Sequence, residues 1–227
     1  MKLQLALDLI DLDAALQIVS AAAPYVDIVE AGTPLIKQHG MAAVRSLRAR
    51  IPNRLILADM KAADAGDLEV RMAAIAGADL VSVLAVAPDE TMAGAIDEAR
   101  LRGVQIVADL LAVPDVTLRA QWLRSLGVDY ILVHCGIDQQ RAGQTPIGVV
   151  RELASAGYSN LAVAGGINTT NIRQLLDIPG LEIIVVGGAI TRASEPGLVA
   201  QELRDAIEGR KDHDRGDARD HRQDRGK

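Results

Sequence analysis

The 227-residue chain contains no phenylalanine, and aromatic residues make up only 2% of it. Proteins that bind single-stranded nucleic acid stack bases on aromatic side chains, so this composition argues against that class. The formal net charge of −6 argues in the same direction, because nucleic-acid-binding surfaces are basic. We therefore expect no nucleic-acid partner.

Cysteine and long apolar runs are also scarce. Cys135 is the single cysteine, so the chain cannot form an internal disulfide, which fits a reducing compartment. No apolar run approaches the ~20 residues that a membrane-spanning helix needs. The opening stretch is interrupted by Asp8 and does not resemble a signal peptide. We expect a soluble, cytoplasmic protein without a membrane partner.

Short apolar runs that alternate with helical patterns dominate the sequence. Continuous apolar runs of this length are typical of parallel strands that are buried on both faces. Eight runs are predicted to be strands: Leu3–Asp8, Val26–Glu30, Arg54–Asp59, Asp79–Val83, Val104–Asp109, Asp129–His134, Asn160–Ala164 and Glu182–Val186.

The segments between the runs show helical signals. Leu68, Met72 and Ile75 follow the third run at helical spacing, and Asp13 offers an N-cap for the helix after the first run. Glycine at a helix-to-strand joint permits the left-handed residue that ends a helix. Three joints carry such a glycine: Gly77, Gly127 and Gly157.

Repeated strand–helix units of this number predict a closed barrel. Eight parallel strands, each followed by a helix, form the (β/α)8 TIM barrel. A doubly wound open sheet is the alternative architecture. We predict one barrel domain over residues 1–208. The remaining residues, 209–227, are rich in charge and poor in apolar side chains, so we predict a disordered tail there.

The stretch from Ala58 to Gly66 is the strongest functional signal. Asp59 and Lys61 lie two residues apart at the end of a strand, so their side chains point to the same face. Asp64 follows just beyond, where a helix is expected to begin. A buried strand does not need such a charge cluster to fold. A site that binds a cation and stabilises an anion does.

Other predicted strands also end in groups that can do chemistry. In a TIM barrel the carboxyl ends of all strands meet at one rim, where active sites of this fold lie. Glu30 and Asp59 are hard oxygen ligands of the kind that Mg²⁺ prefers, and His134 is a candidate for proton transfer. The full predicted rim consists of Asp8, Glu30, Asp59, Lys61, Asp109 and His134.

Simpler structural roles remain open at several of these positions. Asp8 could cap the following turn instead of binding substrate or acting in catalysis. Glu30 could form a salt bridge with Lys61. Asp109 suits a structural partner of a basic rim residue better than a direct substrate contact, and His134 could be a buried core residue.

The last two predicted strands each end in a pair of glycines, Gly165-Gly166 and Gly187-Gly188. The loops after strands seven and eight bind phosphate in many TIM barrels through backbone N–H groups, and glycine lets the backbone approach closely. Arg192 could add a charge-assisted hydrogen bond to the same phosphate.

These residues resemble a known family. Asp59-x-Lys61-x-x-Asp64 is similar to the DxKxxD motif of the orotidine 5′-monophosphate decarboxylase suprafamily. Further blocks resemble its 3-hexulose-6-phosphate synthase branch, and they are distributed over residues 1–208. These blocks are Met1–Asp8, Val29–Ile36, Ala58–Lys61, His134–Gln140, Val163–Ile167 and Val186–Thr191.

The resemblance implies a Mg²⁺-dependent, reversible aldol condensation of formaldehyde with D-ribulose 5-phosphate to 3-hexulose 6-phosphate. It assigns the metal to Glu30 and Asp59 and the conserved lysine and histidine of the family to Lys61 and His134. It also implies a homodimer, in which Asp64 reaches the active site of the partner subunit. We expect the reaction to pass through an enediolate that Mg²⁺ and Lys61 stabilise.

Competing functions remain open. Ala62-Ala63 departs from the residues that are common in the synthases, whereas Thr33-Pro34 favours them. The related 3-keto-L-gulonate-6-phosphate decarboxylases share the same carboxylates, lysine and histidine, so decarboxylation is the first alternative. A non-catalytic sugar-phosphate-binding barrel is the second. A Schiff base on Lys61 is a rival aldolase mechanism, which neighbouring carboxylates disfavour because they keep the amine charged.

Overall fold

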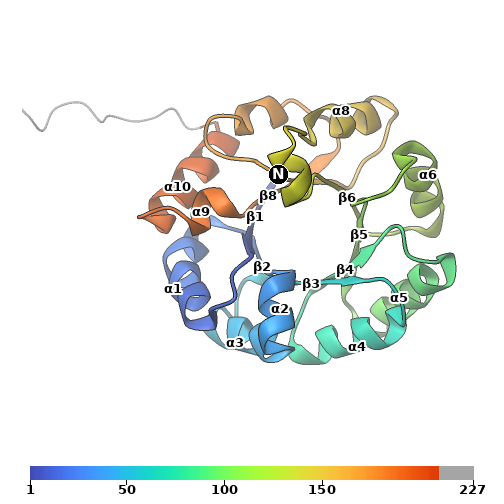
Figure 1. Cartoon of the computed structure of the whole chain (residues 1–227), viewed down its shortest axis with the longest axis horizontal. Helices are drawn as coiled ribbons and strands as arrows, with labels where there is room; N and C mark the ends of the chain where they lie inside the picture. The colour runs from blue at the N-terminus through green and yellow to red at the C-terminus, as the bar shows by residue number, and fades with distance from the viewer. Residues whose placement is uncertain (210–227) are drawn as a thin grey trace, which may run out of the picture.

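The computed structural model, which describes residues 1–209, is a closed barrel of eight parallel strands in chain order. β1 pairs with β2 on one side and with β8 on the other, which closes the ring. Figure 1 shows the strands as an inner ring that the helices surround. The TIM-barrel prediction is therefore confirmed, and the open-sheet alternative is wrong. The predicted tail lies outside the described residues apart from Gly209.

The strands begin and end close to their predicted limits. They are β1 Lys2–Leu7, β2 Ile28–Ala31, β3 Leu55–Ala62, β4 Leu80–Leu84, β5 Gln105–Asp109, β6 Tyr130–His134, β7 Leu161–Ala164 and β8 Leu181–Val186. β3 is the main exception, because it continues past Asp59 to Ala62.

The helices include several short ones that the sequence did not reveal. The α-helices are α1 Leu12–Ala22, α2 Thr33–His39, α3 Ala42–Arg50, α4 Gly66–Ala76, α5 Asp89–Arg102, α6 Val116–Leu126, α7 Ile137–Arg141, α8 Ile147–Ser155, α9 Gly188–Thr191 and α10 Pro196–Ile207. Two 3₁₀ helices, η1 Ala23–Tyr25 and η2 Ile172–Leu175, complete the set in the described part of the chain. None of these helices is long and apolar enough to cross a bilayer.

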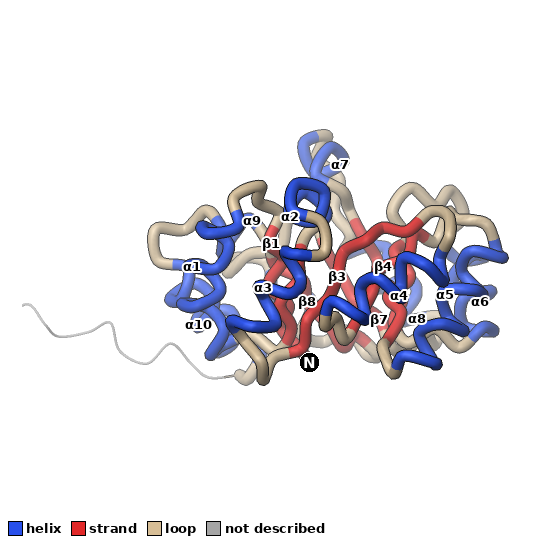
Figure 2. Tube along the Cα trace, turned by 90° about the horizontal axis from the view of Figure 1, so that it is seen from below, coloured by secondary structure: helices blue, strands red, loops and turns tan. Residues whose placement is uncertain are grey.

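The unpredicted helices α2, α7 and α9 all follow strand ends, and each is too short to show a helical period. Figure 2 shows α2 and α7 at the end of the barrel opposite the N-terminus, above the carboxyl ends of the strands. The predicted cap of α1 is also corrected. Asp11 rather than Asp13 is the N-cap, because the Asp11 carboxylate accepts a 3.0 Å hydrogen bond from the Ala14 N–H.

Two apolar layers hold the barrel together, and strand alternation separates them. One layer fills the barrel interior and includes Ile28, Leu57 and Leu80. The larger layer lies between the strands and the helices and includes their neighbours on the strands, such as Val29 and Val81. Because successive side chains point to opposite faces, the same alternation decides which polar residues enter the interior.

Three aspartates at the amino ends of the strands make the same contact. In each case one carboxylate oxygen accepts a hydrogen bond of 2.7–2.8 Å from the backbone N–H of the second residue of the neighbouring strand. The pairs are Asp27 with Leu3, Asp79 with Ile56, and Asp129 with Ile106. Asp79 additionally accepts from the Arg48 guanidinium. The contact links adjacent strands at the amino-terminal end of the barrel, opposite the predicted site.

Replacement of Asp79 with alanine should therefore lower stability without touching the opposite rim. The Ile56 N–H loses its acceptor and Arg48 loses its carboxylate partner, so we expect the free energy of unfolding to fall by about 1–3 kcal/mol. Urea denaturation measures this change. The control is Asp97→Ala, which removes an exposed pair with Arg100 and should change stability by less than about 0.5 kcal/mol. Equal effects of the two substitutions would contradict this account of Asp79.

The helix predicted from Leu68, Met72 and Ile75 is present as α4, but these three side chains point away from the barrel. Their exposed fractions are 49%, 45% and 71%. The face of α4 that packs on the barrel carries smaller residues, among them Val70 and Ala73. The helical spacing was thus correct, whereas the apolar stripe that revealed it remains uncovered in the single chain.

Candidate active site

Polar side chains gather in the upper half of the barrel interior. Gln4, Glu30, Asp59, Ser82 and Asp109 are all buried, with exposed fractions of 0–8%. All five occupy the strand face that also carries the interior apolar layer. Glu30, Asp59, Ser82 and Asp109 each follow an interior apolar residue by two positions toward the carboxyl end, whereas Gln4 precedes Ala6 by two. Burial of so many polar groups is costly unless they are hydrogen-bonded.

Asp59 is the centre of this cluster. Its two carboxylate oxygens accept hydrogen bonds from the Lys61 ammonium at 3.0 and 2.8 Å. The Ser82 hydroxyl donates to Oδ1 at 2.7 Å, and the Thr33 hydroxyl lies 2.7 Å from Oδ2. The prediction that Asp59 and Lys61 point the same way is confirmed.

A second carboxylate, Asp109, joins Lys61 to His134. Asp109 Oδ2 lies 3.3 Å from Lys61 Nζ and 2.8 Å from His134 Nδ1. Asp109 Oδ1 accepts from the Leu111 N–H at 2.9 Å. Asp109 is fully buried, and its role as a partner of basic rim residues, the simpler sequence interpretation, is confirmed.

The charges in this group stabilise one another. Burial opposes the charged form of Lys61, but Asp59 and Asp109 outweigh it and raise the pKa of the ammonium. Burial likewise opposes the charged form of Asp109, but hydrogen bonding to His134 and the nearby Lys61 charge lower the pKa of its carboxyl. Because the ionised Asp109 only accepts hydrogen bonds, it favours the His134 tautomer with the proton on Nδ1 and leaves Nε2 free to accept a proton.

Glu30 lies beside Asp59 but differs from it in its partners. The Gln4 side-chain amide donates to Glu30 Oε2 at 2.6 Å. Burial and the neighbouring carboxylates of Asp59 and Asp8 hold the pKa of Glu30 well above its usual range. Lys61 forms its ion pairs with Asp59 and Asp109 and none with Glu30 in the described chain, so the alternative Glu30–Lys61 salt bridge is wrong.

Asp8 stands at the rim between the carboxylate cluster and the glycine loops. Its carboxylate lies against Gly32 and 3.7 Å from where a Cβ would stand on Gly187. Partial burial and Asp59 raise the pKa of Asp8, against the lowering effect of Lys61 and His134. In residues 1–209 the Asp8 carboxylate accepts no hydrogen bond from the turn that follows it, where the α1 cap is Asp11.

Asp64 is not part of the cluster within one chain. Its side chain is exposed, and its carboxylate accepts a 2.8 Å hydrogen bond from the adjacent Ala65 N–H. No ion pair connects it with Lys61 in residues 1–209. Asp64 lies in an exposed stretch, residues 63–65, between two residues with positive φ, Lys61 at +48° and Ala65 at +49°.

The two glycine pairs lie at the rim, as predicted, and Gly165 and Gly166 adopt positive φ, which favours glycine. A Cβ on Gly165, at φ +120°, would collide with the Cys135 carbonyl. A Cβ on Gly188 would collide with the Arg192 guanidinium, which therefore lies directly against this glycine. Gly166 and Gly187 complete the two pairs. A cation over exposed backbone N–H groups suits an anionic ligand.

The carboxylates fit a divalent cation with oxygen ligands. Asp8, Glu30, Asp59 and Asp109 surround the single ammonium of Lys61, so a cation beside Glu30 and Asp59 would relieve the repulsion between them. No set of three or more His, Cys, Asp or Glu side chains in residues 1–209 forms a complete metal cage. Mg²⁺ usually takes one or two protein carboxylates and leaves its other positions to water and substrate, so the pair suffices.

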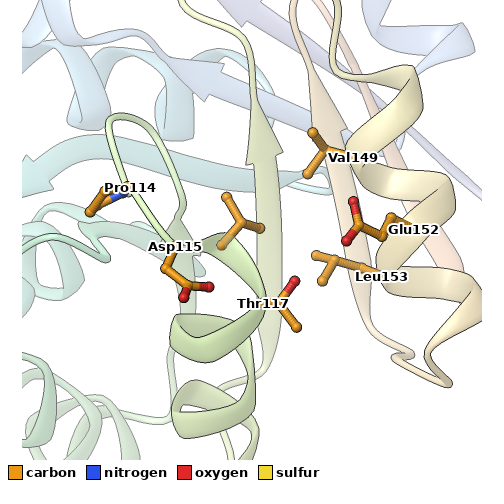
Figure 3. Close-up of a pocket in the computed structure, with 7 residues that line it drawn as sticks. Pro114, Asp115, Thr117, Val149, Glu152 and Leu153 are labelled. Carbon is orange, nitrogen blue, oxygen red and sulfur yellow. The ribbon is translucent and has the colours of Figure 1, made fainter.

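A cavity of about 340 Å³ lies elsewhere, between the start of α6 and α8 (Figure 3). Asp115 on its edge is the N-cap of α6 and accepts a 2.9 Å hydrogen bond from the Leu118 N–H. None of the rim residues lines this cavity, and its other carboxylate is Glu152. The concentration of buried polar groups therefore places the candidate active site at the barrel rim.

Three residues of the cluster were not predicted as site residues: Gln4, Thr33 and Ser82. Gln4 and Ser82 are polar side chains within otherwise apolar strands. Gln4 has the parity of Asp8 just after the end of β1, and Ser82 has the parity of Leu80, which faces the barrel interior. A polar residue at such a position in an apolar strand was the available signal.

Comparisons with known proteins agree with this geometry. Residues 1–203 match the model of the orotidine 5′-phosphate decarboxylase / HUMPS family. A 3-hexulose-6-phosphate synthase of Staphylococcus saprophyticus is 42% identical over 92% of this chain and 100% of its own length.

Solved structures give the same result. The 3-hexulose-6-phosphate synthase of Salmonella typhimurium superposes with a TM-score of 0.89 at 34% identity, over 93% of this chain and all of that one. A 3-keto-L-gulonate-6-phosphate decarboxylase of Vibrio cholerae gives 0.81 at 32% identity, over 92% and 97% of the two chains. With its barrel and its Asp59–Lys61 rim, the chain therefore belongs to the orotidine 5′-phosphate decarboxylase / HUMPS family, in the group of the 3-hexulose-6-phosphate synthases.

Proposed function

We propose that the protein catalyses the reversible, Mg²⁺-dependent aldol condensation of formaldehyde with D-ribulose 5-phosphate to 3-hexulose 6-phosphate, in the cytoplasm. The observation that carries this proposal is the buried Asp59–Lys61–Asp109–His134 network at the rim. The chain that holds it is 42% identical to a 3-hexulose-6-phosphate synthase. The network combines a fixed positive charge with a proton acceptor, and both are needed to form and hold an enediolate.

His134 is the proposed proton carrier. Asp109 holds its Nδ1–H, so Nε2 takes the proton from C1 of the sugar phosphate and leaves the electron pair on the enediolate. C1 then attacks the carbonyl carbon of formaldehyde, which forms the new carbon–carbon bond. The oxygen of formaldehyde receives the proton that His134 took, which returns His134 to its neutral form, and the ketone of the sugar is restored.

Lys61 is the proposed electrostatic stabiliser of the enediolate oxygens. The neighbouring carboxylates raise its pKa and favour the ammonium form, which disfavours Lys61 as a Schiff-base nucleophile near neutral pH. Glu30 and Asp59 would hold Mg²⁺, which when bound supplies Lewis-acid stabilisation of negative charge on substrate oxygens. The Thr33 and Ser82 hydroxyls are hydrogen-bonded to the Asp59 carboxylate.

The phosphate end of the sugar is assigned to the two glycine loops. Gly165, Gly166, Gly187 and Gly188 would offer backbone N–H groups, and Arg192 lies against Gly188. Asp8 lies between this end and the carboxylate cluster and is assigned to the sugar hydroxyls. Anchoring the phosphate converts binding energy into orientation of C1 at His134.

A homodimer is part of the proposal. The stripe of Leu68, Met72 and Ile75 on α4 is exposed in the single chain and begins four residues after Asp64. Apolar stripes of this kind favour association. Packing of this stripe on a second copy would bring Asp64 to the partner's rim, and this explains why Asp64 has no role in its own cluster.

A formaldehyde-consumption assay with ribulose 5-phosphate, with and without Mg²⁺, tests the reaction. We expect turnover only when sugar phosphate and metal are both present.

The decarboxylase alternative has a specific basis, because the Vibrio cholerae relative shares the fold at 32% identity. Release of CO₂ from 3-keto-L-gulonate 6-phosphate without formaldehyde consumption would favour it, and tight sugar-phosphate binding without either turnover would favour a binding protein.

A further inference from the structure

The register between β3 and β4 changes at the site. Ala58 lies opposite Val81 and Ala62 lies opposite Val83, so the three residues Asp59–Lys61 face Ser82 alone. An irregularity of this kind bends the strand and leaves backbone groups without their usual ladder partners. Here the irregularity lies between Ala58 and Ala62, the segment that contains Asp59 and Lys61, on which the proposed chemistry depends.

Lys61 is strained as a result. Its φ of +48° lies in the left-handed region, which is unfavourable for a side chain with a Cβ. Strained backbone at a functional residue persists only where the surrounding structure holds it in place. The contacts of the Lys61 backbone therefore decide where its ammonium points.

Ser82 supplies that contact. Its hydroxyl oxygen accepts a 3.0 Å hydrogen bond from the Lys61 backbone N–H and donates a 2.7 Å hydrogen bond to Asp59 Oδ1. Ser82 is 1% exposed, so water does not compete for either bond. The Thr33 hydroxyl also hydrogen-bonds to Asp59, at its carboxylate and its carbonyl, but within residues 1–209 it forms no hydrogen bond with Lys61.

We propose that Ser82 is a positioning residue for the reaction: its hydroxyl fixes the bulged end of β3, so that the Asp59 carboxylate and the Lys61 ammonium are held in one geometry. The proposal rests on the proposed function and extends it to a residue that touches neither substrate nor metal. Outer hydrogen-bond partners of metal ligands generally tune affinity and activity by about 10–100-fold.

Ser82→Ala, Ser82→Thr and the matched control Val81→Ala test the proposal. Val81 precedes Ser82 on β4 and packs toward the helices, so its truncation lowers stability without removing a hydrogen bond at the rim. Three quantities are measured: kcat and KM for ribulose 5-phosphate, the Mg²⁺ dissociation constant by calorimetry without substrate, and hydrogen exchange of the Lys61 amide.

For Ser82→Ala we expect kcat to fall and the Mg²⁺ dissociation constant to rise, each by about 10–100-fold, with KM nearly unchanged because the phosphate is held elsewhere. The Lys61 amide should exchange faster. Ser82→Thr restores the hydroxyl and should recover most of each loss, whereas Val81→Ala should lower only the melting temperature.

Wild-type kcat and Mg²⁺ affinity in Ser82→Ala would overturn the proposal, as would equal losses in Val81→Ala or unchanged exchange at Lys61. Absence of formaldehyde consumption in the wild-type protein would instead refute the proposed function. The exchange and calorimetry measurements still judge Ser82 in that case, so the two failures are distinguishable.

Discussion

Asp59→Asn should abolish formaldehyde consumption while the barrel remains folded. We expect kcat/KM to fall by about 10³-fold or more, because the substitution removes a proposed Mg²⁺ ligand and an anionic partner of Lys61 together. The asparagine amide group would also point a donor at one of three donors, Lys61, Ser82 or Thr33, where the carboxylate now accepts.

Glu30→Gln distinguishes the loss of a metal ligand from the loss of the anionic partner of Lys61, which Asp59→Asn combines. Glu30 makes no ion pair with Lys61, and its hydrogen bond is to Gln4, so its neutralisation leaves the Asp59–Lys61–Asp109 network intact. A loss of activity in Glu30→Gln that excess Mg²⁺ partly restores would place the defect at metal binding. Titration of Mg²⁺ in the formaldehyde assay measures this.

The matched control is Glu182→Gln. It neutralises a carboxylate of β8 that lies 3.9 Å from Lys2 at the opposite end of the barrel, and it should leave both activity and Mg²⁺ dependence unchanged. Thermal melts of all three variants verify folding. Full activity of the wild-type protein in excess EDTA would refute the metal assignment, and a borohydride-trapped Lys61 adduct would support the Schiff-base route instead.

Most of the rim was predictable because side-chain alternation along a strand is a strong constraint. Once the strand ends at Glu30, Asp109 and His134 were recognised, a closed parallel barrel had to bring them to one rim. The sequence could not show that Asp109, rather than Asp64, is the second partner of Lys61. Pairing across β3, β4 and β5 decides that, and it depends on contacts between residues far apart in the chain.

The irregular backbone of β3 at the site could not be predicted from the sequence, for a related physical reason. The bulge opposite Ser82 and the positive φ at Lys61 break the two-residue period on which the strand prediction rested. Tertiary contacts, including the two hydrogen bonds of the Ser82 hydroxyl, stabilise this conformation, although the backbone of a non-glycine residue disfavours positive φ. The prediction therefore brought Asp59 and Lys61 to one rim and missed Ser82, whose hydroxyl is hydrogen-bonded to both residues.

The apolar stripe on α4 shows the opposite limit. Helical spacing of Leu68, Met72 and Ile75 predicted the helix, but spacing alone does not say which surface an apolar stripe contacts. In the single chain the stripe is exposed, and it lies next to an aspartate without a role in its own cluster. Both facts have one explanation if the active site is shared between two subunits.

A mixture of two inactive variants should therefore regain activity. Lys61→Ala loses the proposed stabilising charge in its own barrel, whereas Asp64→Asn loses the carboxylate that it would lend to its partner. We expect each homodimer to be inactive. In a heterodimer, the barrel that retains Lys61 receives an intact Asp64 from the other subunit, so one of its two sites is complete.

Random exchange of subunits makes half of the dimers heterodimers, so the mixture should recover about a quarter of the wild-type activity. The matched control mixes Lys61→Ala with Asp59→Asn. These two residues belong to the same barrel, where their side chains are hydrogen-bonded, so each heterodimer carries one lesion at each of its sites and no recovery is expected. Steady-state formaldehyde consumption after co-refolding measures both mixtures. A fully active monomer on size-exclusion chromatography, or an active Asp64→Asn homodimer, would contradict the shared site, because Asp64 would then have nothing to supply across the α4 stripe.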